Sequence, residues 1–275
     1  MRIARKLSDL RAQRAALGME LGFVPTMGAL HQGHVALVSA ARAAGRPVAA
    51  SIFVNPTQFG PNEVFLAYPR TEEADLAKLE AAGCALVWLP DVETMYPADG
   101  ASRIVVGGPA ERWEGELRPG HFAGVATVVA KLFGQVRPSH AYFGEKDWQQ
   151  IQVISRMTAD LLLPVEIVPV ATVREADGLA LSSRNRFLTA AERQTAPALR
   201  AAMVVAIERL LGGMAVSAAL AAGEIRLGEA GLKADYFALV HAHSLAPVEV
   251  VAAPARLIAA AKLGRIRLLD NAAVC

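Results

Sequence analysis

The chain has 275 residues, of which 53% are hydrophobic and 20% are charged, and a net charge of +2. This length provides for a large core and more than one domain, and the composition excludes a disordered chain. The weak positive charge comes without a basic run or an interleaved aromatic stripe, so the sequence predicts no nucleic-acid partner.

The N-terminus and the cysteines predict a cytoplasmic protein without a membrane partner. No apolar segment follows the charged start Met1–Lys6, so no signal peptide is expected. The charge-free stretch Leu210–Gly223 is shorter than the roughly 18–20 residues of a membrane span. Cys84 and Cys275 are the only cysteines, which predicts neither a disulfide framework nor a zinc site.

Short apolar runs alternate with helical patterns through the first two thirds of the chain. The predicted strands are Leu21–Val24, Val48–Val54, Ala85–Leu89, Ala141–Phe143 and Val165–Val170. The predicted helices between them cover residues 34–44, 71–82, 123–136 and 147–160, and Thr71 is expected to cap the second. Strands that are apolar along their length are typical of parallel sheets covered on both faces. The pattern therefore predicts an α/β fold, a Rossmann-like doubly wound parallel sheet that binds ligands outside the carboxyl ends of its strands.

Two other parts of the chain have a different composition. Pro90–Pro119, rich in proline and glycine, is expected to be an insertion over one edge of the sheet. A polar connector, Arg174–Gly178, precedes an alanine-rich helical region from Ala190 to about Ala230. Strand-like runs follow at Tyr236–Val240, Val248–Val251 and Ile266–Leu269. We therefore predict a Rossmann-like domain over residues 1–176 and a smaller α+β domain over residues 177–275.

The stretch Pro25–His34 joins the first predicted strand to its helix. His31 and His34 lie three residues apart, so both rings share one face of the helix start. A helix N-terminus presents unpaired N–H groups and the positive end of a dipole, and imidazoles donate hydrogen bonds to phosphate oxygens. Gly28 and Gly33 allow tight turns and close approach of a ligand. This predicts an anion site, although a polar turn with a satisfied histidine pair also explains the motif alone.

Two further polar segments follow predicted strands and are expected at the same edge of the sheet. Asn55 and Gln58 carry amides that donate and accept hydrogen bonds, but an Asn-Pro turn also explains them. Lys146 offers a point charge for phosphate oxygens, and Gln150 lies one turn into the next helix, facing the same crevice as Gln58. A helix-capping box is the alternative explanation of this second segment.

A fourth segment, Ser182–Asn185, places two hydroxyls and a guanidinium in a row beside the connector. Such a loop suits a mobile phosphate clamp, and a solvated polar loop is equally compatible with it. His121 opens a helix and remains ambiguous between a structural and a site role. The chain has neither a P-loop motif nor a Gly-x-Gly-x-x-Gly after the first strand, so a nucleotide needs another phosphate cradle here.

Taken together, these segments resemble the pantoate–β-alanine ligase (pantothenate synthetase) family, within the His-x-Gly-His nucleotidyltransferase superfamily. The segments that carry the resemblance span nearly the whole chain in the family's order: Pro25–His34, Ser51–Phe59, Tyr68–Thr71, His121–Val125, Phe143–Gln150, Val173–Gly178, Ser182–Asn185 and Leu268–Asn271. The resemblance implies ATP-dependent condensation of pantoate with β-alanine through a pantoyl adenylate, with Mg²⁺ on the phosphates. It also implies a homodimer and a lid role for the C-terminal domain.

The resemblance assigns site residues position by position. It implies catalytic roles for His34, His31, Lys146 and Arg184. It implies ATP contacts for Met27, Gly28, Ala29, Leu30, His31, Gln32, Gly33, His34, Gly144, Glu145, Lys146, Asp147, Val173, Leu181, Ser182, Ser183 and Arg184. It implies pantoate and β-alanine contacts for Gln58, Gln150 and Asn55, and it names no protein ligand for the metal.

Three positions depart from the family pattern, namely Thr57, Trp148 and Leu181. None of them carries the expected chemistry, although the ATP contact of Leu181 then rests on backbone or apolar surface. Two other functions remain open from the sequence. One is a nucleotidyltransferase of the same fold that acts on another substrate, and the other is a non-catalytic nucleotide sensor.

Overall fold

The computed structural model describes residues 1–60, 65 and 68–275 and divides the chain into two compact units. The first unit comprises Met1–Gly144 and Gln149–Ala171, and the second comprises Glu145–Trp148 and Thr172–Cys275. The chain thus leaves the first unit for four residues after Gly144 before it returns. The predicted domain boundary between residues 176 and 177, and the lid role of the C-terminal part, stay predictions.

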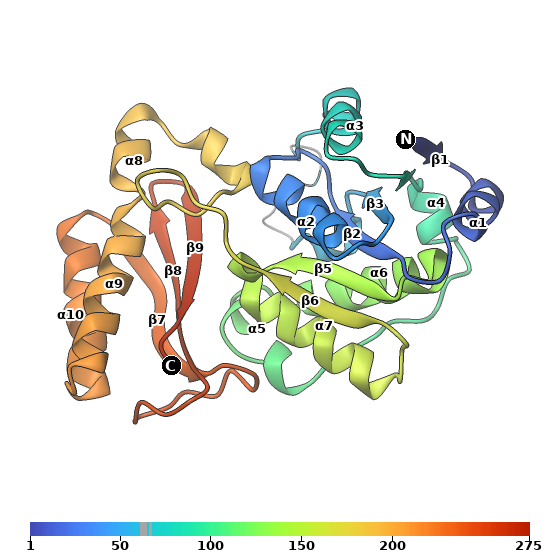
Figure 1. Ribbon diagram of the computed structural model, residues 1–275. Helices are drawn as coiled ribbons and strands as arrows, with labels where there is room; N and C mark the ends of the chain where they lie inside the picture. The colour runs from blue at the N-terminus through green and yellow to red at the C-terminus, as the bar shows by residue number, and fades with distance from the viewer. Residues whose placement is uncertain (61–64, 66–67) are drawn as a thin grey trace. The chain divides into compact units, whose positions relative to one another are not determined.

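The described part of the first unit is built on a six-stranded parallel sheet, which confirms the predicted fold class (Figure 1). The strands are β1 (Arg2–Ala4), β2 (Gly22–Thr26), β3 (Val48–Ile52), β4 (Leu86–Trp88), β5 (His140–Gly144) and β6 (Glu166–Val170). They lie in the order β1-β4-β3-β2-β5-β6, and each neighbouring pair is parallel. The direction of winding reverses between β2 and β5, and in such sheets ligands bind outside the carboxyl ends at this reversal.

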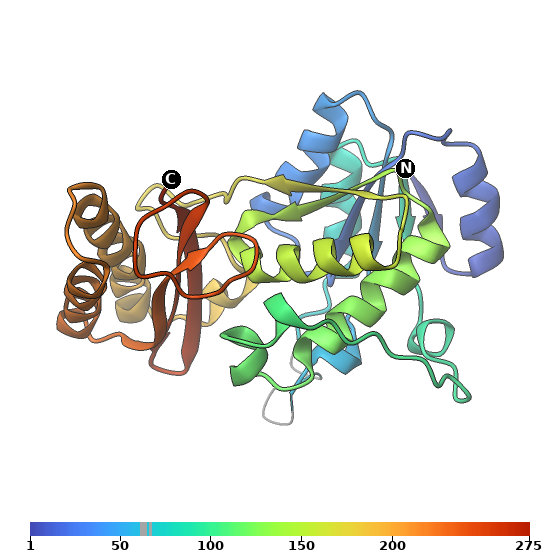
Figure 2. The same ribbon diagram turned by 90° about the horizontal axis from the view of Figure 1, so that it is seen from below.

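Helices cover both faces of this sheet, as right-handed crossovers require. Figure 2 shows α2 (Gln32–Ala43) and α3 (Glu72–Ala81) on one face and α6 (His121–Val136) and α7 (Trp148–Asp160) on the other. Under α2 and α3 lies a buried apolar cluster that includes Val24, Val38 and Leu79, each 0% exposed. Strands and helices therefore pack as predicted for a doubly wound sheet.

The N-terminal strand and helix were not predicted. β1 has only three residues in a highly charged start, and α1 (Leu7–Ala15) buries a single side chain, Leu10. Such short or polar elements owe their stability to packing against the rest of the unit rather than to local periodicity. The proline-rich stretch 90–119 contains α4 (Val92–Met95), the 3₁₀ turn η3 (Gly108–Ala110) and α5 (Glu114–Leu117).

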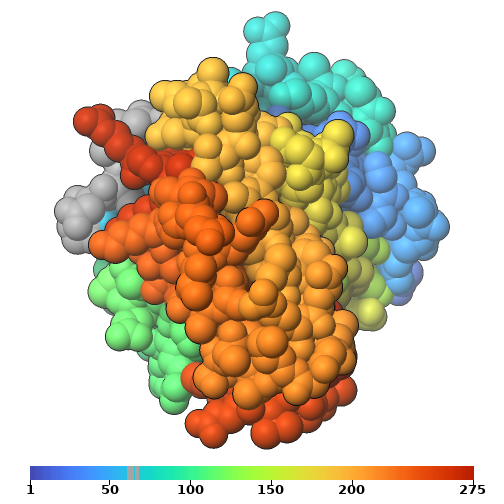
Figure 3. All heavy atoms as spheres, turned by 90° about the vertical axis from the view of Figure 1, so that its left-hand side faces the viewer, coloured from blue at the N-terminus to red at the C-terminus, as the bar shows by residue number. Residues whose placement is uncertain are grey.

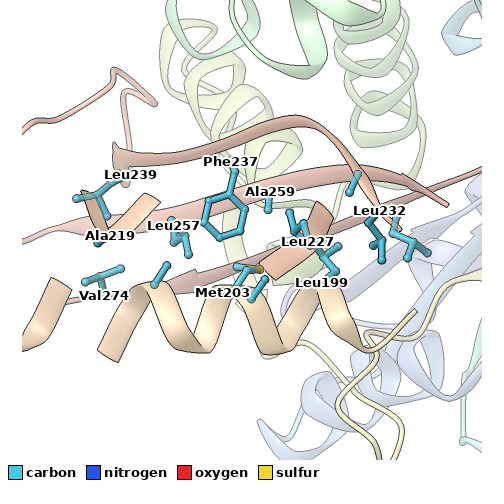
Figure 4. Packing of buried hydrophobic residues seen from close by; sticks show 14 of the residues in the cluster. Leu199, Met203, Ala219, Leu227, Leu232, Phe237, Leu239, Leu257, Ala259 and Val274 are labelled. Atoms are coloured by element: carbon cyan, nitrogen blue, oxygen red, sulfur yellow. The ribbon is translucent and has the colours of Figure 1, made fainter. Parts of the chain in front are cut away.

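The second unit contains a three-stranded antiparallel sheet and a set of helices. The strands β7 (Lys233–His241), β8 (Ala255–Leu263) and β9 (Ile266–Ala273) lie in chain order. The helices are α8 (Ala190–Thr195), α9 (Ala198–Leu211) and α10 (Val216–Glu229). Figure 4 shows α9, α10 and the sheet meeting at an apolar core with Met203, Leu227 and Phe237 at its centre. The outer surfaces of α9 and α10 form the orange face turned toward the viewer in Figure 3.

Two predictions for this unit were wrong. Val248–Val251 is not a strand: these residues form no ladder, and the isolated bridge just before them joins Val240 to Pro247. The long strand β8 was missed because its alanines favour helix by intrinsic propensity. Pairing on both sides, with β7 and with β9, overrides that propensity.

In the part of the chain that the structure describes, no helix combines the length and the apolar character needed to cross a membrane.

Candidate active site

The predicted anion site lies where β2 passes into α2, at the carboxyl edge of the sheet. His31 is the N-cap of α2, and its Nδ1 accepts a hydrogen bond from the Gly33 N–H at 3.1 Å. The Nδ1 of His34 accepts from the His31 N–H at 3.2 Å, which completes a capping box made of two histidines. The ring centroids lie 4.2 Å apart. The structure therefore brings the two rings together at a helix N-terminus.

These hydrogen bonds assign the tautomer of both rings. A ring nitrogen that accepts a backbone N–H carries no proton, so each neutral imidazole carries its proton on Nε2. Each Nε2–H is then a donor on the side of the ring opposite Nδ1. The capping role and the donor role of His31 and His34 thus use different atoms and are compatible.

The turn before the histidines is held by a buried carboxylate that the sequence analysis did not single out. Asp75 on α3 is 0% exposed and accepts from the N–H groups of Ala29 and Leu30, both at 2.8 Å. Thr71 Oγ1 donates to the same carboxylate at 3.0 Å, so Thr71 occupies the N-cap position of α3 without capping it through its side chain. Gly28 and Ala29 both have positive φ, at 83° and 52°. The carboxylate stabilises a left-handed turn that a non-glycine residue rarely adopts.

Asn55 and Gln58 lie just after β3, beside this turn. The Gln58 amide is fixed from both ends, because Asn55 Nδ2 donates to its Oε1 at 3.1 Å and its Nε2 donates to Met27 Sδ at 3.0 Å. Asn55 is 1% exposed, and its Oδ1 accepts from Tyr96 OH at 2.7 Å and from Thr57 Oγ1 at 2.9 Å. The side chain of Asn55 therefore orients Gln58 and has its own groups satisfied inside the unit.

A close approach of α6 completes this corner. Asn55 Nδ2 also donates to the Gly124 carbonyl at 3.2 Å, and a Cβ on Gly124 would lie 2.4 Å from the Thr57 carbonyl oxygen. Only glycine fits at that position. His121, which the sequence left ambiguous, is 9% exposed and places Nδ1 2.9 Å from the Gln58 carbonyl oxygen. It supports the backbone of Gln58, so the first unit brings Met27, the histidine turn and Gln58 into one neighbourhood.

Gln150 lies in the first turn of α7 and is half-buried. Its neighbour Gln149 is 7% exposed and donates to the carbonyls of Pro109 at 2.9 Å and Arg112 at 2.7 Å. Gln149 therefore ties α7 to the proline-rich stretch. The role of Gln150 in binding pantoate stays a prediction.

The second unit contains a pocket that gathers residues from four segments of the chain. Its polar lining is formed by Lys146, Ser182, Arg184, Asn185, Arg200, Arg267 and Asp270. Ser182 is the N-cap of the 3₁₀ turn η5 (Ser183–Phe187), where its Oγ accepts from the Arg184 N–H at 3.3 Å and keeps its O–H as a donor. Basic side chains outnumber the single acidic one, which suits an anion.

The charged groups around this pocket leave it with a net positive charge. Arg174 grips Asp270 with both guanidinium nitrogens, at 2.6 and 2.8 Å, and so neutralises that carboxylate. Burial, with a contribution from Arg174, lowers the pKa of Arg200. Because burial is the larger cause, the positive character of the pocket rests on its four basic side chains against one carboxylate. A phosphate group entering the pocket therefore meets a net positive charge.

The loop from Val173 to Leu181 is closed on itself beside the pocket. The Leu181 N–H donates to the Val173 carbonyl at 3.0 Å, so these two predicted ATP contacts are neighbours. Gly178, with φ of 90°, turns the chain between them. On the outer side Arg193 binds Glu175 at 2.7 Å and Asp177 at 2.6 Å, and this pairing lowers the pKa of Asp177. The loop is therefore pinned at both ends rather than freely mobile.

The residues predicted from the sequence belong to local motifs. The residues that hold those motifs in place were not predicted. Asp75, Tyr96 and Asn271 were not assigned. Asp75 carried a signal, because it lies one turn before the buried Leu79 on the inner face of α3, where an acidic residue is unusual unless it is hydrogen-bonded. Tyr96 and Asn271 act across the fold, and no local spacing predicts them.

Among the described residues, no group of three or more His, Cys, Asp and Glu side chains could hold a metal ion. The protein therefore offers no Mg²⁺ cage of its own in that part of the chain. This does not argue against Mg²⁺ on a nucleotide, since Mg²⁺ is commonly held by substrate phosphates and water with few protein ligands.

Comparison with known proteins matches these features to one family. The family model described as pantoate-beta-alanine ligase matches residues 2–273. The chain is 58% identical to the pantothenate synthetase of Acidiphilium cryptum and 58% identical to that of Rhizorhabdus wittichii, covering 100% of this chain in both cases and 100% and 99% of the relatives.

Solved structures agree with the sequence relatives. The pantothenate synthetase of Thermus thermophilus has 50% identity and a TM-score of 0.95, with 100% of this chain and 99% of that chain covered. A pantoate-beta-alanine ligase from Francisella tularensis, complexed with beta-gamma ATP and beta-alanine, has 33% identity and a TM-score of 0.82 over 100% of this chain and 98% of that chain.

Proposed function

The chain belongs to the pantoate–β-alanine ligase family, and we infer from this membership that it is an enzyme that condenses pantoate with β-alanine using ATP. In the first step the pantoate carboxylate attacks the α-phosphate of ATP, which gives pantoyl adenylate and pyrophosphate. In the second step the amine of β-alanine attacks the acyl carbon, and AMP leaves. The main support for this function is the match of the family model to residues 2–273.

The first step brings two anions together, so the site must neutralise charge and hold the reactants in line. We assign the phosphates to Lys146, Ser182, Ser183 and Arg184, since three of these line one positively charged pocket. Their donors stabilise the charge that develops as pyrophosphate leaves.

The histidine turn supplies the second set of donors. The rings of His31 and His34 lie at a helix N-terminus, where the dipole also favours negative charge, and each carries a donor at Nε2. We assign them to the ATP phosphates, with His34 as the proton donor. We also assign the backbone from Met27 to Leu30 to the ATP contact. Asp75 holds this turn in shape by accepting from the N–H groups of Ala29 and Leu30.

Gln58, Gln150 and Asn55 are assigned to pantoate and β-alanine. Support comes from the fixed Gln58 amide, which lies beside the histidine turn with both of its polar atoms held in place. An amide of fixed orientation distinguishes a hydroxyl from a carboxylate oxygen by the direction of its hydrogen bond. Asn55 contributes by orienting Gln58.

Other properties follow from the same assignment. Mg²⁺ bound to the ATP phosphates would offset part of their charge. The protein works in the cytoplasm as a homodimer, and its second unit acts as a lid over the reactive adenylate. The free thiols of Cys84 and Cys275 fit a reducing compartment.

Pantoate-dependent exchange of labelled pyrophosphate into ATP, without β-alanine, tests the first step. The wild-type protein is expected to catalyse it, and His34→Ala and Lys146→Ala are expected to abolish it nearly completely while the circular dichroism stays unchanged. A nucleotidyltransferase of another substrate would not respond to pantoate. A nucleotide sensor would bind ATP and show no exchange, and either result would overturn the proposal.

A further inference from the structure

Asn271 on β9 grips the backbone of the segment that carries Lys146. It is 5% exposed, and its Nδ2 donates to the carbonyl oxygens of Glu145 and Lys146, each at 2.8 Å. One amide group thus satisfies two consecutive carbonyls of the short 3₁₀ turn η4 (Glu145–Asp147). Both hydrogens of the Asn271 amide are used on this turn.

The amide is itself held in a fixed orientation. Arg256 Nη1 donates to Asn271 Oδ1, which settles which end of the amide faces η4. The Asn271 N–H donates to Asp270 Oδ1 at 2.8 Å, and Asp270 is gripped by Arg174. The donor side of Asn271 therefore has no freedom to turn away from Glu145 and Lys146.

Arg256 holds the same segment at two further points. Its guanidinium lies 3.5 Å from the centroid of the Trp148 ring, and its Nη2 lies 3.5 Å from Glu145 Oε2. Trp148 Nε1 donates to the Ala242 carbonyl at 2.6 Å. Residues on both sides of Lys146 are thus fixed to the sheet of the second unit, although the chain up to Gly144 and from Gln149 belongs to the first.

This attachment fixes the backbone from which the Lys146 side chain starts. Lys146 lines the pocket together with Ser182 and Arg184. Its side chain is long and rotatable, so the position of the backbone limits the region that the ammonium can reach. Misplacement of a charge-stabilising group by about 1 Å costs up to about 100-fold in rate.

We propose that Asn271 is a positioning residue that, through its two hydrogen bonds to η4, aims Lys146 at the phosphates of the nucleotide. The inference rests on the proposed function, in which Lys146 binds those phosphates. It gives a role to Asn271 in the Leu268–Asn271 segment. This segment contributes to the family resemblance but had no assigned role. The competing explanation is that Asn271 merely stabilises the second unit.

The substitution Asn271→Asp separates these explanations. It is isosteric and keeps an oxygen for Arg256, but it turns a carboxylate oxygen instead of two donors toward the carbonyls of Glu145 and Lys146. We expect the affinity for ATP, measured by isothermal titration calorimetry, to fall about tenfold, and kcat/KM for pyrophosphate exchange to fall by about 10- to 100-fold. The Ala273→Asp variant adds a carboxylate at an exposed position of the same strand and is expected to bind ATP as the wild type does.

A double-mutant cycle provides the readout that a purely structural role would not give. In a Lys146→Gln background, Asn271→Asp is expected to change the ATP dissociation constant less than about twofold, because the ammonium that Asn271 aims is gone. An equal loss of affinity in both backgrounds would overturn the proposal, as would wild-type affinity of Asn271→Asp itself.

A second variant and the wild-type exchange assay show which of the two proposals fails. If Asn271→Asp does not fold, Arg256→Lys enters the same cycle, because one ammonium cannot hold Asn271, Glu145 and the Trp148 ring together. If the wild-type protein shows no pantoate-dependent exchange, the proposed function fails. If wild-type exchange is normal and the cycle shows no coupling, only the role of Asn271 fails.

Discussion

At the scale of single residues, each imidazole of the histidine turn has two roles. Nδ1 satisfies a backbone N–H of the α2 N-terminus, and Nε2 carries the proton that we assign to phosphate binding. This division is useful because asparagine reproduces one task and not the other. Its side-chain oxygen lies near the position of Nδ1, and asparagine is among the preferred N-cap residues.

The substitution His31→Asn is therefore expected to keep the stability of the protein and to lose activity. The cap remains, so the urea midpoint should match that of the wild type, while pyrophosphate exchange should fall by at least about 100-fold, the size of effect seen when a transition-state donor is removed. His31→Ala is the comparison, since it loses the cap as well and should cost about 1 kcal/mol of stability. Full exchange activity in His31→Asn would show that His31 only caps the helix.

At the scale of secondary-structure elements, α3 determines the shape of the turn that precedes the histidines. Asp75 accepts two backbone N–H groups of that turn from a fully buried position, 46 and 45 residues away in the sequence. A carboxylate accepts with both oxygens, whereas an amide has one oxygen and one donor. An amide in this place leaves a buried backbone N–H facing another donor.

Asp75→Asn is expected to lower the free energy of unfolding by about 1–3 kcal/mol, the cost of an unsatisfied buried group. The KM for ATP should rise in the same variant, because Ala29 and Leu30 belong to the proposed ATP contact. Urea denaturation and steady-state kinetics measure the two effects. Glu73→Gln, at an exposed position of the same helix, is the matched control and should change neither. A stable Asp75→Asn variant with unchanged KM would contradict this role of α3.

Some strands have a conformation that their own sequence predicts, whereas others depend on their neighbours in the sheet. The strands β2 to β6 were predicted to within a few residues because each is a short apolar run between turn residues. The strand β8 was missed because its alanines carry no strand signal of their own and its neighbours in the sheet decide its conformation.

The same distinction applies to the site. His31, His34, Lys146 and Ser182 follow strand ends or begin turns, so local spacing predicts them. Asn271 meets Lys146 from 125 residues away, and such a contact exists only once the sheet of the second unit has formed. Motifs predicted the groups that we assign to the ligands, and tertiary packing supplied the groups that hold them.

At the scale of the whole molecule, the residues assigned to ATP fall into two sets. His31 and His34 belong to the first unit, whereas Lys146, Ser182 and Arg184 belong to the second. In the proposed function, one triphosphate binds both sets and so links the two units through its own charge. The chain passes between the units after Gly144, before Gln149 and after Ala171, and such crossing points are where a closing motion changes backbone angles.

Binding of ATP together with pantoate is therefore expected to shift the molecule toward a closed state. Closure excludes water from the pantoyl adenylate, whose anhydride bond would otherwise hydrolyse before β-alanine attacks it. Small-angle X-ray scattering should show a smaller radius of gyration with both substrates than with pantoate alone. In Arg184→Ala, which lacks one contact from the second unit to the phosphates, the decrease should be reduced. An unchanged radius of gyration in the wild type under saturating substrates would rule out the lid role, because a ligand moves such an equilibrium only by binding one state more tightly than the other.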